Sequence, residues 1–389
     1  MNPLSCDCRP RANVFDRGSL GRRGVLRATG LGFAASLVAT LISEARTARA
    51  EKVAGAVPEV DRLRVTMVTD NLVWPFFPPQ QLDGLKIERT AGAERPGVAP
   101  RATLTSEWGL SMLAESLAGA ETRTVLVDFG YTSAALLTNM RILGVDPGRI
   151  DAMALSHGHF DHFGGLTGLL VATKGTLKQG LPLFVGGEDC FCTRELRNGG
   201  DFGALDRQAI LDAGLTLMLA EGPSIAADHA IISGQIPLAS FEKPLVPTVE
   251  KTGLIGGLGC DPAREPAAKN TGTFVPDDFQ HEIATSYLVK GRGLVVLTSC
   301  SHRGVVNTVR QAMAASAAER LHAVIGGFHL VPPLPEPYIR QTVAELKVMR
   351  PDFLVTAHCT GDAFYDIARN EMPGQVIHSA VGSRFVFGT

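Results

Sequence analysis

Residues 156–163 read Ser-His-Gly-His-Phe-Asp-His-Phe, and this segment constrains the fold more than any other part of the chain. It places three imidazoles and a carboxylate within six consecutive positions: His157, His159, Asp161 and His162. Such side chains seldom pack together in an apolar core. Imidazole nitrogen and carboxylate oxygen are, however, ligands for zinc, iron or manganese. The spacing therefore predicts a metal site rather than a solvated loop.

The residues on either side predict where the cluster lies. Residues 150–155 form a short, mostly apolar stretch typical of a buried strand, and Gly164 and Gly165 precede an expected helix. On such a strand-to-helix loop, the first two histidines can point the same way, while Asp161 and His162 on the next turn face a second position. Two metals roughly 3.5–4 Å apart form a hydrolytic centre that activates water.

Three further apolar stretches each lead into a histidine, which is the pattern expected if the strand ends converge. These are residues 293–298 before Cys300 and His302, residues 323–325 before His329, and residues 352–356 before His358. As a working hypothesis we divide the ligands into two sets. His157, His159 and His302 would hold one metal, and Asp161, His162 and His358 the other.

The His-x-His-x-Asp-His motif resembles the metallo-β-lactamase superfamily, whose α/β fold is a four-layer αββα sandwich with the metals at one edge of two sheets. Five segments, in order, resemble one branch of it, the 7,8-dihydropterin-6-ylmethyl-4-(β-D-ribofuranosyl)aminobenzene 5'-phosphate synthases. They are residues 125–130, 155–166, 298–304, 326–330 and 357–361. The resemblance runs from about Leu63 to the C-terminus. It implies two divalent metal ions, zinc first, with manganese or iron as alternatives.

The resemblance also implies roles for residues beside the metals. Asp128 would hydrogen-bond to the metal loop and hold it in place. Most superfamily hydrolases carry a bridging Asp in the fourth motif, where residues 299–302 here read Ser-Cys-Ser-His. We place Cys300 and Cys359 next to the metals in a supporting role, with direct ligation as the alternative.

Four residues are candidates for work on the substrate, which we expect to be a small anionic molecule. Asp161 would orient the attacking water, and His329 would act as an acid or base on the substrate, with a more distant supporting role as the alternative. Arg303 could hold a phosphate or carboxylate, with a surface salt bridge as the alternative use. Asn71 lies in a loop expected at the mouth of the site.

The N-terminal segment resembles a twin-arginine export signal. Arg22 and Arg23 precede an apolar run over residues 30–42, and Ala48-Arg49-Ala50 fits cleavage after Ala50. The run is shorter than the roughly 20 residues that span a bilayer, so we expect no stable membrane insertion. The twin-arginine translocase would be a partner during export, residues 1–50 the signal peptide, residues 51–389 one catalytic domain, and the location periplasmic.

Charge argues against one class of partner. Residues 1–50 hold eight arginines and three acidic residues, which leaves 29 basic and 36 acidic side chains in the remainder. A net acidic chain without a basic run is not expected to bind nucleic acid.

Five of the seven cysteines lie outside the leader, and an odd number means at least one free thiol. Cys190 and Cys192 could pair with each other under strain, or one of them with Cys260 in an oxidising compartment. All three could equally be small buried residues.

These observations favour an exported metal-dependent hydrolase acting on an ester or phosphate-type substrate. A synthase-like transferase is the close alternative. A mononuclear iron persulfide dioxygenase-type oxidoreductase is a second, and a metal-bound protein without activity is a third. The metal content would separate hydrolase from dioxygenase, because the first needs two zinc ions and the second one ferrous ion.

Overall fold

A computed structural model describes residues 53, 55–90, 102–245 and 247–388, all within one compact unit, Thr47–Thr389. The expected signal peptide, with Arg22 and Arg23, lies outside the described residues. Within the described ranges, none of the helices has both the length and the apolar character needed to cross a membrane.

A nine-stranded sheet forms one half of this unit. Parallel strands make up one side of it and antiparallel strands the other. The order is β11 (Thr216–Leu219), β8 (Pro182–Val185), β7 (Ala152–Ala154), β6 (Glu121–Val127), β5 (Ser111–Ala118), β2 (Arg62–Thr69), β23 (Ser383–Phe387), β4 (Leu85–Arg89) and β3 (Gln80–Leu82).

An eight-stranded sheet forms the other half. Its strands β19 to β22 run parallel to one another. The order is β12 (Ser224–Ala226), β13 (Ala230–Ile232), β18 (Thr285–Val289), β19 (Gly293–Thr298), β20 (Leu321–Gly326), β21 (Phe353–Thr356) and β22 (Val376–His378), with β1 (Glu59–Val60) paired to β18.

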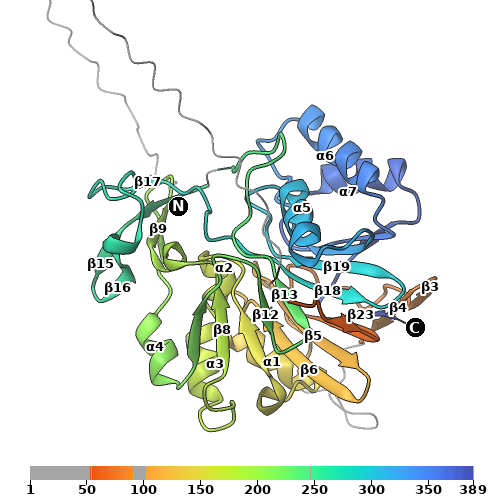
Figure 1. Cartoon of the computed structure of the whole chain (residues 1–389), viewed down its shortest axis with the longest axis horizontal. Helices are drawn as coiled ribbons and strands as arrows, with labels where there is room; N and C mark the ends of the chain where they lie inside the picture. The colour runs from red at the N-terminus through yellow and green to blue at the C-terminus, as the bar shows by residue number, and fades with distance from the viewer. Residues whose placement is uncertain (1–52, 54, 91–101, 246, 389) are drawn as a thin grey trace, which may run out of the picture. The chain divides into compact units, whose positions relative to one another are not determined.

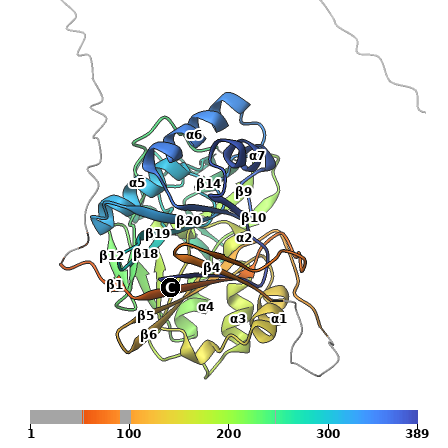
Figure 2. The same ribbon diagram turned by 90° about the vertical axis from the view of Figure 1, so that its right-hand side faces the viewer.

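Three hydrophobic cores define four layers. Successive residues of a strand point to opposite faces, so Val65 and Met67 of β2 enter the core between the sheets, while Val68 enters a core on the outer face. That outer core is covered by α1 (Ser133–Leu143), α3 (Leu166–Ala172) and α4 (Arg207–Asp212). The outer face of the second sheet is covered by α5 (Val305–Ser316), α6 (Glu336–Met349) and α7 (Asp362–Glu371). Figures 1 and 2 show the resulting αββα sandwich.

The histidine motifs follow strands whose carboxyl ends meet at one edge of the two sheets. In the first sheet, β6 leads to Asp128 and the parallel β7 leads to residues 156–163. In the second, β19, β20 and β21 are parallel and lead to His302, His329 and His358. The expected strands before these histidines are therefore present. The cluster is not wholly a loop, however, because it contains one helical turn, α2 (Phe160–Phe163).

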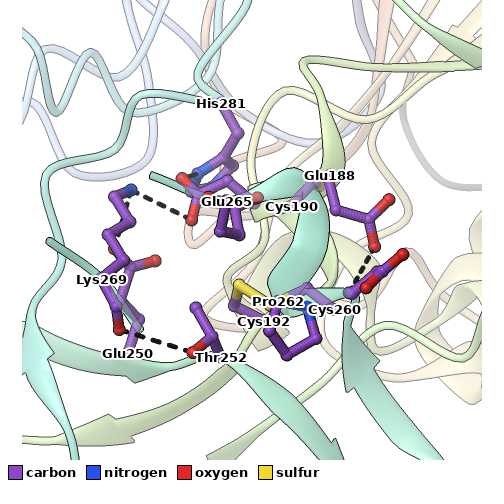
Figure 3. Close-up of a disulfide and its surroundings, with 12 residues drawn as sticks. Glu188, Cys190, Cys192, Glu250, Thr252, Cys260, Pro262, Glu265, Lys269 and His281 are labelled. Atoms are coloured by element: carbon purple, nitrogen blue, oxygen red, sulfur yellow. Dashed lines mark hydrogen bonds and ion pairs between the residues drawn. A yellow bond between two sulfur atoms is a disulfide. The ribbon is translucent and has the colours of Figure 1, made fainter. Parts of the chain in front are cut away.

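A long excursion between β8 and β18 adds two small sheets beside this edge. The first has the order β10 (Asp201–Gly203), β9 (Thr193–Leu196), β14 (Thr248–Lys251) and β17 (Val275–Pro276), and the second is the hairpin β15 (Gly253–Ile255) and β16 (Leu258–Cys260). Short 3-10 turns are η1 (Pro147–Arg149), η2 (Glu188–Phe191) and η3 (Pro262–Arg264). A disulfide joins Cys192 at the start of β9 to Cys260 at the end of the hairpin (Figure 3). Of the pairings left open by the sequence, this is the one that the structure contains.

Candidate metal centre

The loop after β7 brings its imidazoles together below the surface. His157, His159, Asp161 and His162 are all buried. The ring of His157 lies 4.7 Å from that of His159 and 4.2 Å from that of His162, measured between centroids. The helical turn α2 begins after His159 and turns Asp161 and His162 toward the second sheet, where Asp161 Oδ2 lies 3.3 Å from Nε2 of His358.

Asp128 holds this loop through contacts at both of its carboxylate oxygens. Oδ1 accepts from the backbone N–H of Ser156 at 2.7 Å, and Oδ2 accepts from Ser156 Oγ at 2.8 Å. Oδ2 also lies 2.7 Å from His162 Nδ1. A carboxylate on one ring nitrogen leaves the other free as a ligand. Nε2 of His162 accordingly faces inward, 3.2 Å from the sulfur of Cys300.

His302 enters from the second sheet. Its ring stacks on Phe279 with centroids 4.0 Å apart, and it lies 4.7 Å from His157 and 4.6 Å from His159. The backbone N–H of His302 donates to the buried carboxylate of Glu282 at 2.7 Å. This bond fixes the position of the loop that carries His302.

His358 enters beside it, after β21. Its backbone N–H donates to Asp70 Oδ1 at 2.9 Å, and its carbonyl accepts from Asn71 Nδ2 at 2.8 Å. Trp108 packs 4.9 Å from the ring and is half exposed. Asn71 thus contacts a proposed ligand from behind and orients it.

Two ligand groups have one ligand atom from each residue within 4.8 Å of the others: His157, Cys300 and His302 in one, and His162, Cys300 and His358 in the other. The same distance limit joins Cys300 to His329 and Cys359 in a third group. Nε2 of His157, both ring nitrogens of His302 and Oδ1 of Asp161 are buried without a hydrogen-bond partner in the described structure. Each such atom costs about 1–3 kcal/mol if left unpaired. The donor set therefore fits divalent metal ions, although the ligand assignment itself stays a prediction.

The electrostatics agree with that fit. Burial lowers the pKa of His159 to about 3 and holds the pKa of His157 and His302 well below the usual value. These imidazoles are consequently neutral, which is the form that binds metals. At His162 burial disfavours the charge, but Asp161 and Asp128 outweigh it and raise the pKa to about 10. A metal ion at Nε2 of His162 would therefore have to displace a proton from this ring.

Comparison with known proteins is consistent with this geometry. The family model described as the metallo-beta-lactamase superfamily matches residues 111–177. A solved structure described as a metal-dependent hydrolase of the beta-lactamase superfamily superimposes with a TM-score of 0.59 at 21% identity, covering 83% of this chain and 98% of that one. The chain has the metallo-β-lactamase fold.

Two curated relatives from Methanocaldococcus jannaschii are similar over most of their length. One is named 7,8-dihydropterin-6-methyl-4-(beta-D-ribofuranosyl)-aminobenzene-5'-phosphate synthase and is 29% identical over 66% of this chain and 82% of its own. The other, an uncharacterized protein, is 26% identical over 61% of this chain and 80% of its own. The resemblance to the metallo-β-lactamase superfamily and its pterin-synthase branch is thereby confirmed.

His329 and Arg303, which were both predicted to face the substrate, lie in different surroundings. The His329 ring is 4.3 Å from that of His302, and its Nδ1 is buried without a hydrogen-bond partner. Arg303 points into the protein, where its guanidinium donates to the carbonyl of Asp278 at 2.6 Å and to that of Ile236. These contacts favour a structural role for Arg303, in which it holds the loop of His302 in place.

Sequence reasoning missed the support that the excursion gives to the candidate metal centre. Nε2 of His159 lies 3.0 Å from Thr248 Oγ1, which in turn donates to Asp277 at 3.2 Å. Asp277 is paired at 2.7 Å with Arg194, a fully buried cation. These residues stand in no recognisable motif, and only the concentration of polar residues in 276–282 could have drawn attention to them.

His281 belongs to the same network. Its Nε2 accepts from the backbone N–H of Gly158 at 3.0 Å, and its Nδ1 lies 2.6 Å from Asp189. It is therefore a buried histidine that anchors the backbone between His157 and His159. Figure 3 shows it above the disulfide, with Lys269 and Glu250 alongside.

Proposed function

We propose that this chain is an exported metal-dependent hydrolase that uses activated water against an ester or phosphate-type substrate. The observation that carries the proposal is the pair of adjacent ligand groups with buried, unpartnered nitrogen and oxygen atoms. Such donors would be costly to bury unless cations bound between them.

Two divalent ions, zinc first, would be held by the predicted sets, His157, His159 and His302 for one and Asp161, His162 and His358 for the other. When bound, a metal pair lowers the pKa of water and stabilises negative charge on an oxygen. The fold agrees with divalent metal binding, and zinc in particular is our proposal.

The protein's own groups would then orient the reactants. Asp161 uses Oδ2 toward His358, which leaves the buried Oδ1 as an acceptor for the proton of a water molecule. His329 has an unpartnered Nδ1 next to His302 and could donate a proton to the leaving group. The half-exposed Trp108 would shield one side from solvent.

The proposed export favours hydrolysis over synthesis. Disulfides persist mainly in oxidising compartments, and the Cys192–Cys260 bond agrees with a periplasmic enzyme. A synthase-like transferase remains the second candidate, because the relative from Methanocaldococcus jannaschii carries that name. Its biosynthetic substrates would be cytosolic, where an exported enzyme has no access to them.

The first experiment measures metals by elemental mass spectrometry on protein purified from the periplasm, followed by a screen of phosphodiesters, esters and lactones. We expect two zinc ions per chain and turnover of one substrate class, both lost in a His157→Ala/His159→Ala double variant. A single iron would instead indicate dioxygenase chemistry. Two zinc ions with turnover only of the synthase substrates would indicate the transferase.

A second experiment addresses the location. Changing Arg22 and Arg23 to Lys should leave uncleaved precursor in the cytoplasm, detected by fractionation and intact mass. Unchanged export of that variant would contradict the twin-arginine route.

A further inference from the structure

Two thiols lie inside the ligand cluster. Cys300 and Cys359 are both buried, and their sulfur atoms are 3.3 Å apart. Gly327 lies against this pair, because a Cβ at that position would lie 2.4 Å from the carbonyl oxygen of Ser299 and 2.7 Å from the sulfur of Cys359. A larger residue there would therefore press on both the backbone and the sulfur.

Cys300 is the residue that the two ligand groups have in common. Its sulfur lies within 4.8 Å of ligand atoms of His157 and His302, and equally of His162 and His358. It is 3.2 Å from Nε2 of His162. Nε2 of His157 and both ring nitrogens of His302 have no hydrogen-bond partner among the described residues, so the first ligand group offers free donor atoms close to this sulfur.

We propose that the sulfur of Cys300 is a ligand shared by both metal positions, and that Cys359 lies beside it without being a ligand. The inference deepens the proposed function and rests on it, since a shared ligand requires two metals. It replaces the supporting role expected for Cys300 from the sequence, and Cys359 keeps that role.

Binding of metal by the Cys300 sulfur needs no oxidant. The S–H bond of Cys300 breaks heterolytically, its proton leaves to the buffer, and the thiolate pair forms the bonds to metal. Thiolate and Asp161 together then supply two negative charges against the two dications. Because thiolate is a soft ligand that suits zinc and iron better than manganese, the inference also argues against manganese in this site.

Cobalt substitution tests the inference, since a thiolate bound to Co²⁺ gives a sulfur-to-metal charge-transfer band in the near ultraviolet. The exported full-length enzyme is stripped with a chelator and reloaded with two equivalents of Co²⁺. We expect the band in the wild type and in Cys359→Ser, and its loss in Cys300→Ser. Zinc binding by Cys300→Ser should also release one proton fewer per chain, measured by titration.

A second variant covers the case in which Cys300→Ser does not fold. Cys300→Asp supplies a carboxylate at the same point and should hold two metals without the band. Persistence of the band in either Cys300 variant, or its loss in Cys359→Ser, would overturn the inference. A wild type with two cobalt ions and no band would overturn the inference alone, whereas a wild type that holds no metal would overturn the proposed function as well.

Discussion

Substitutions of Asp128 test how the metal loop is held. Asp128→Ala and Asp128→Asn should differ in their effects on stability and on metal affinity. The side chain is fully buried and contacts Ser156 N, Ser156 Oγ and His162 Nδ1. In Asp128→Ala, Ser156 Oγ can still pair with His157 Nδ1, 2.9 Å away. Ser156 N and His162 Nδ1 keep no partner, and two orphaned donors cost about 2–6 kcal/mol.

Asp128→Asn should spare stability and still weaken metal binding. Its oxygen can keep the bond to the N–H of Ser156, which places the amide NH₂ against His162 Nδ1. That ring nitrogen must then accept, so the proton of the imidazole moves to Nε2, the atom that faces Cys300. Loss of such a contact typically lowers metal affinity about 10–100-fold.

The assays separate the two effects. Urea unfolding of chelator-stripped protein reports stability, and competition with a chromophoric chelator reports zinc affinity. We expect Asp128→Ala to lose both and Asp128→Asn to lose mainly affinity, with Asp212→Asn on the exposed face of α4 as the matched control. Zinc affinity of Asp128→Asn equal to that of the wild type would refute the role of Asp128 in fixing the tautomer of His162.

Three further perturbations test the support around the centre. Arg194→Met should destabilise the protein by about 3–5 kcal/mol, measured by urea unfolding, because it leaves the carboxylate of Asp277 buried and unpaired; a change below about 1 kcal/mol would contradict this. Replacing Cys192 and Cys260 by Ser should cost about 2–4 kcal/mol, and dithiothreitol should lower the wild-type melting temperature to that of the variant but leave the variant unaffected. Burial raises the pKa of Glu242 from its ordinary value of 4.5 to about 7, so between these two values the folded state holds a proton that the unfolded state has lost, and stability should fall as the pH rises through this window. Glu242→Gln should flatten that part of the pH profile, and an unaltered profile would show that Glu242 does not titrate there.

Much of the centre was predictable because its ligands are local in sequence. His157, His159, Asp161 and His162 lie so close in sequence that they must share one small region of the fold. Few packings bury four such side chains together without a metal. Each remaining histidine of the proposed sets follows an apolar strand, and parallel strands place their carboxyl ends at one edge. Element boundaries shifted by only one or two residues, as at β7 and β20.

The excursion between β8 and β18 could not be predicted in the same way. Its strands have two to four residues, too few for a periodic pattern, and its charged residues look like those of a solvated surface. Thr248 and Asp277 reach His159 because β14 and its partner strand β17 fold back over the loop after β7. The same folding brings Cys260 to Cys192, 68 residues away.

The sequence by itself determined the fold class, through the resemblance of its motifs to the metallo-β-lactamase superfamily, and the strands that lead to the predicted ligands, because those strands follow from the local hydrophobic pattern. The ligand set itself stays a prediction. Only the tertiary structure decided which atoms meet. In the folded chain, the guanidinium of Arg303 donates to a backbone carbonyl, and His281 accepts a hydrogen bond from the metal loop. Cys300 lies within reach of both ligand groups. The physical reason is that such contacts join residues far apart in the chain, whose distances depend on how two sheets and an excursion pack rather than on any local preference.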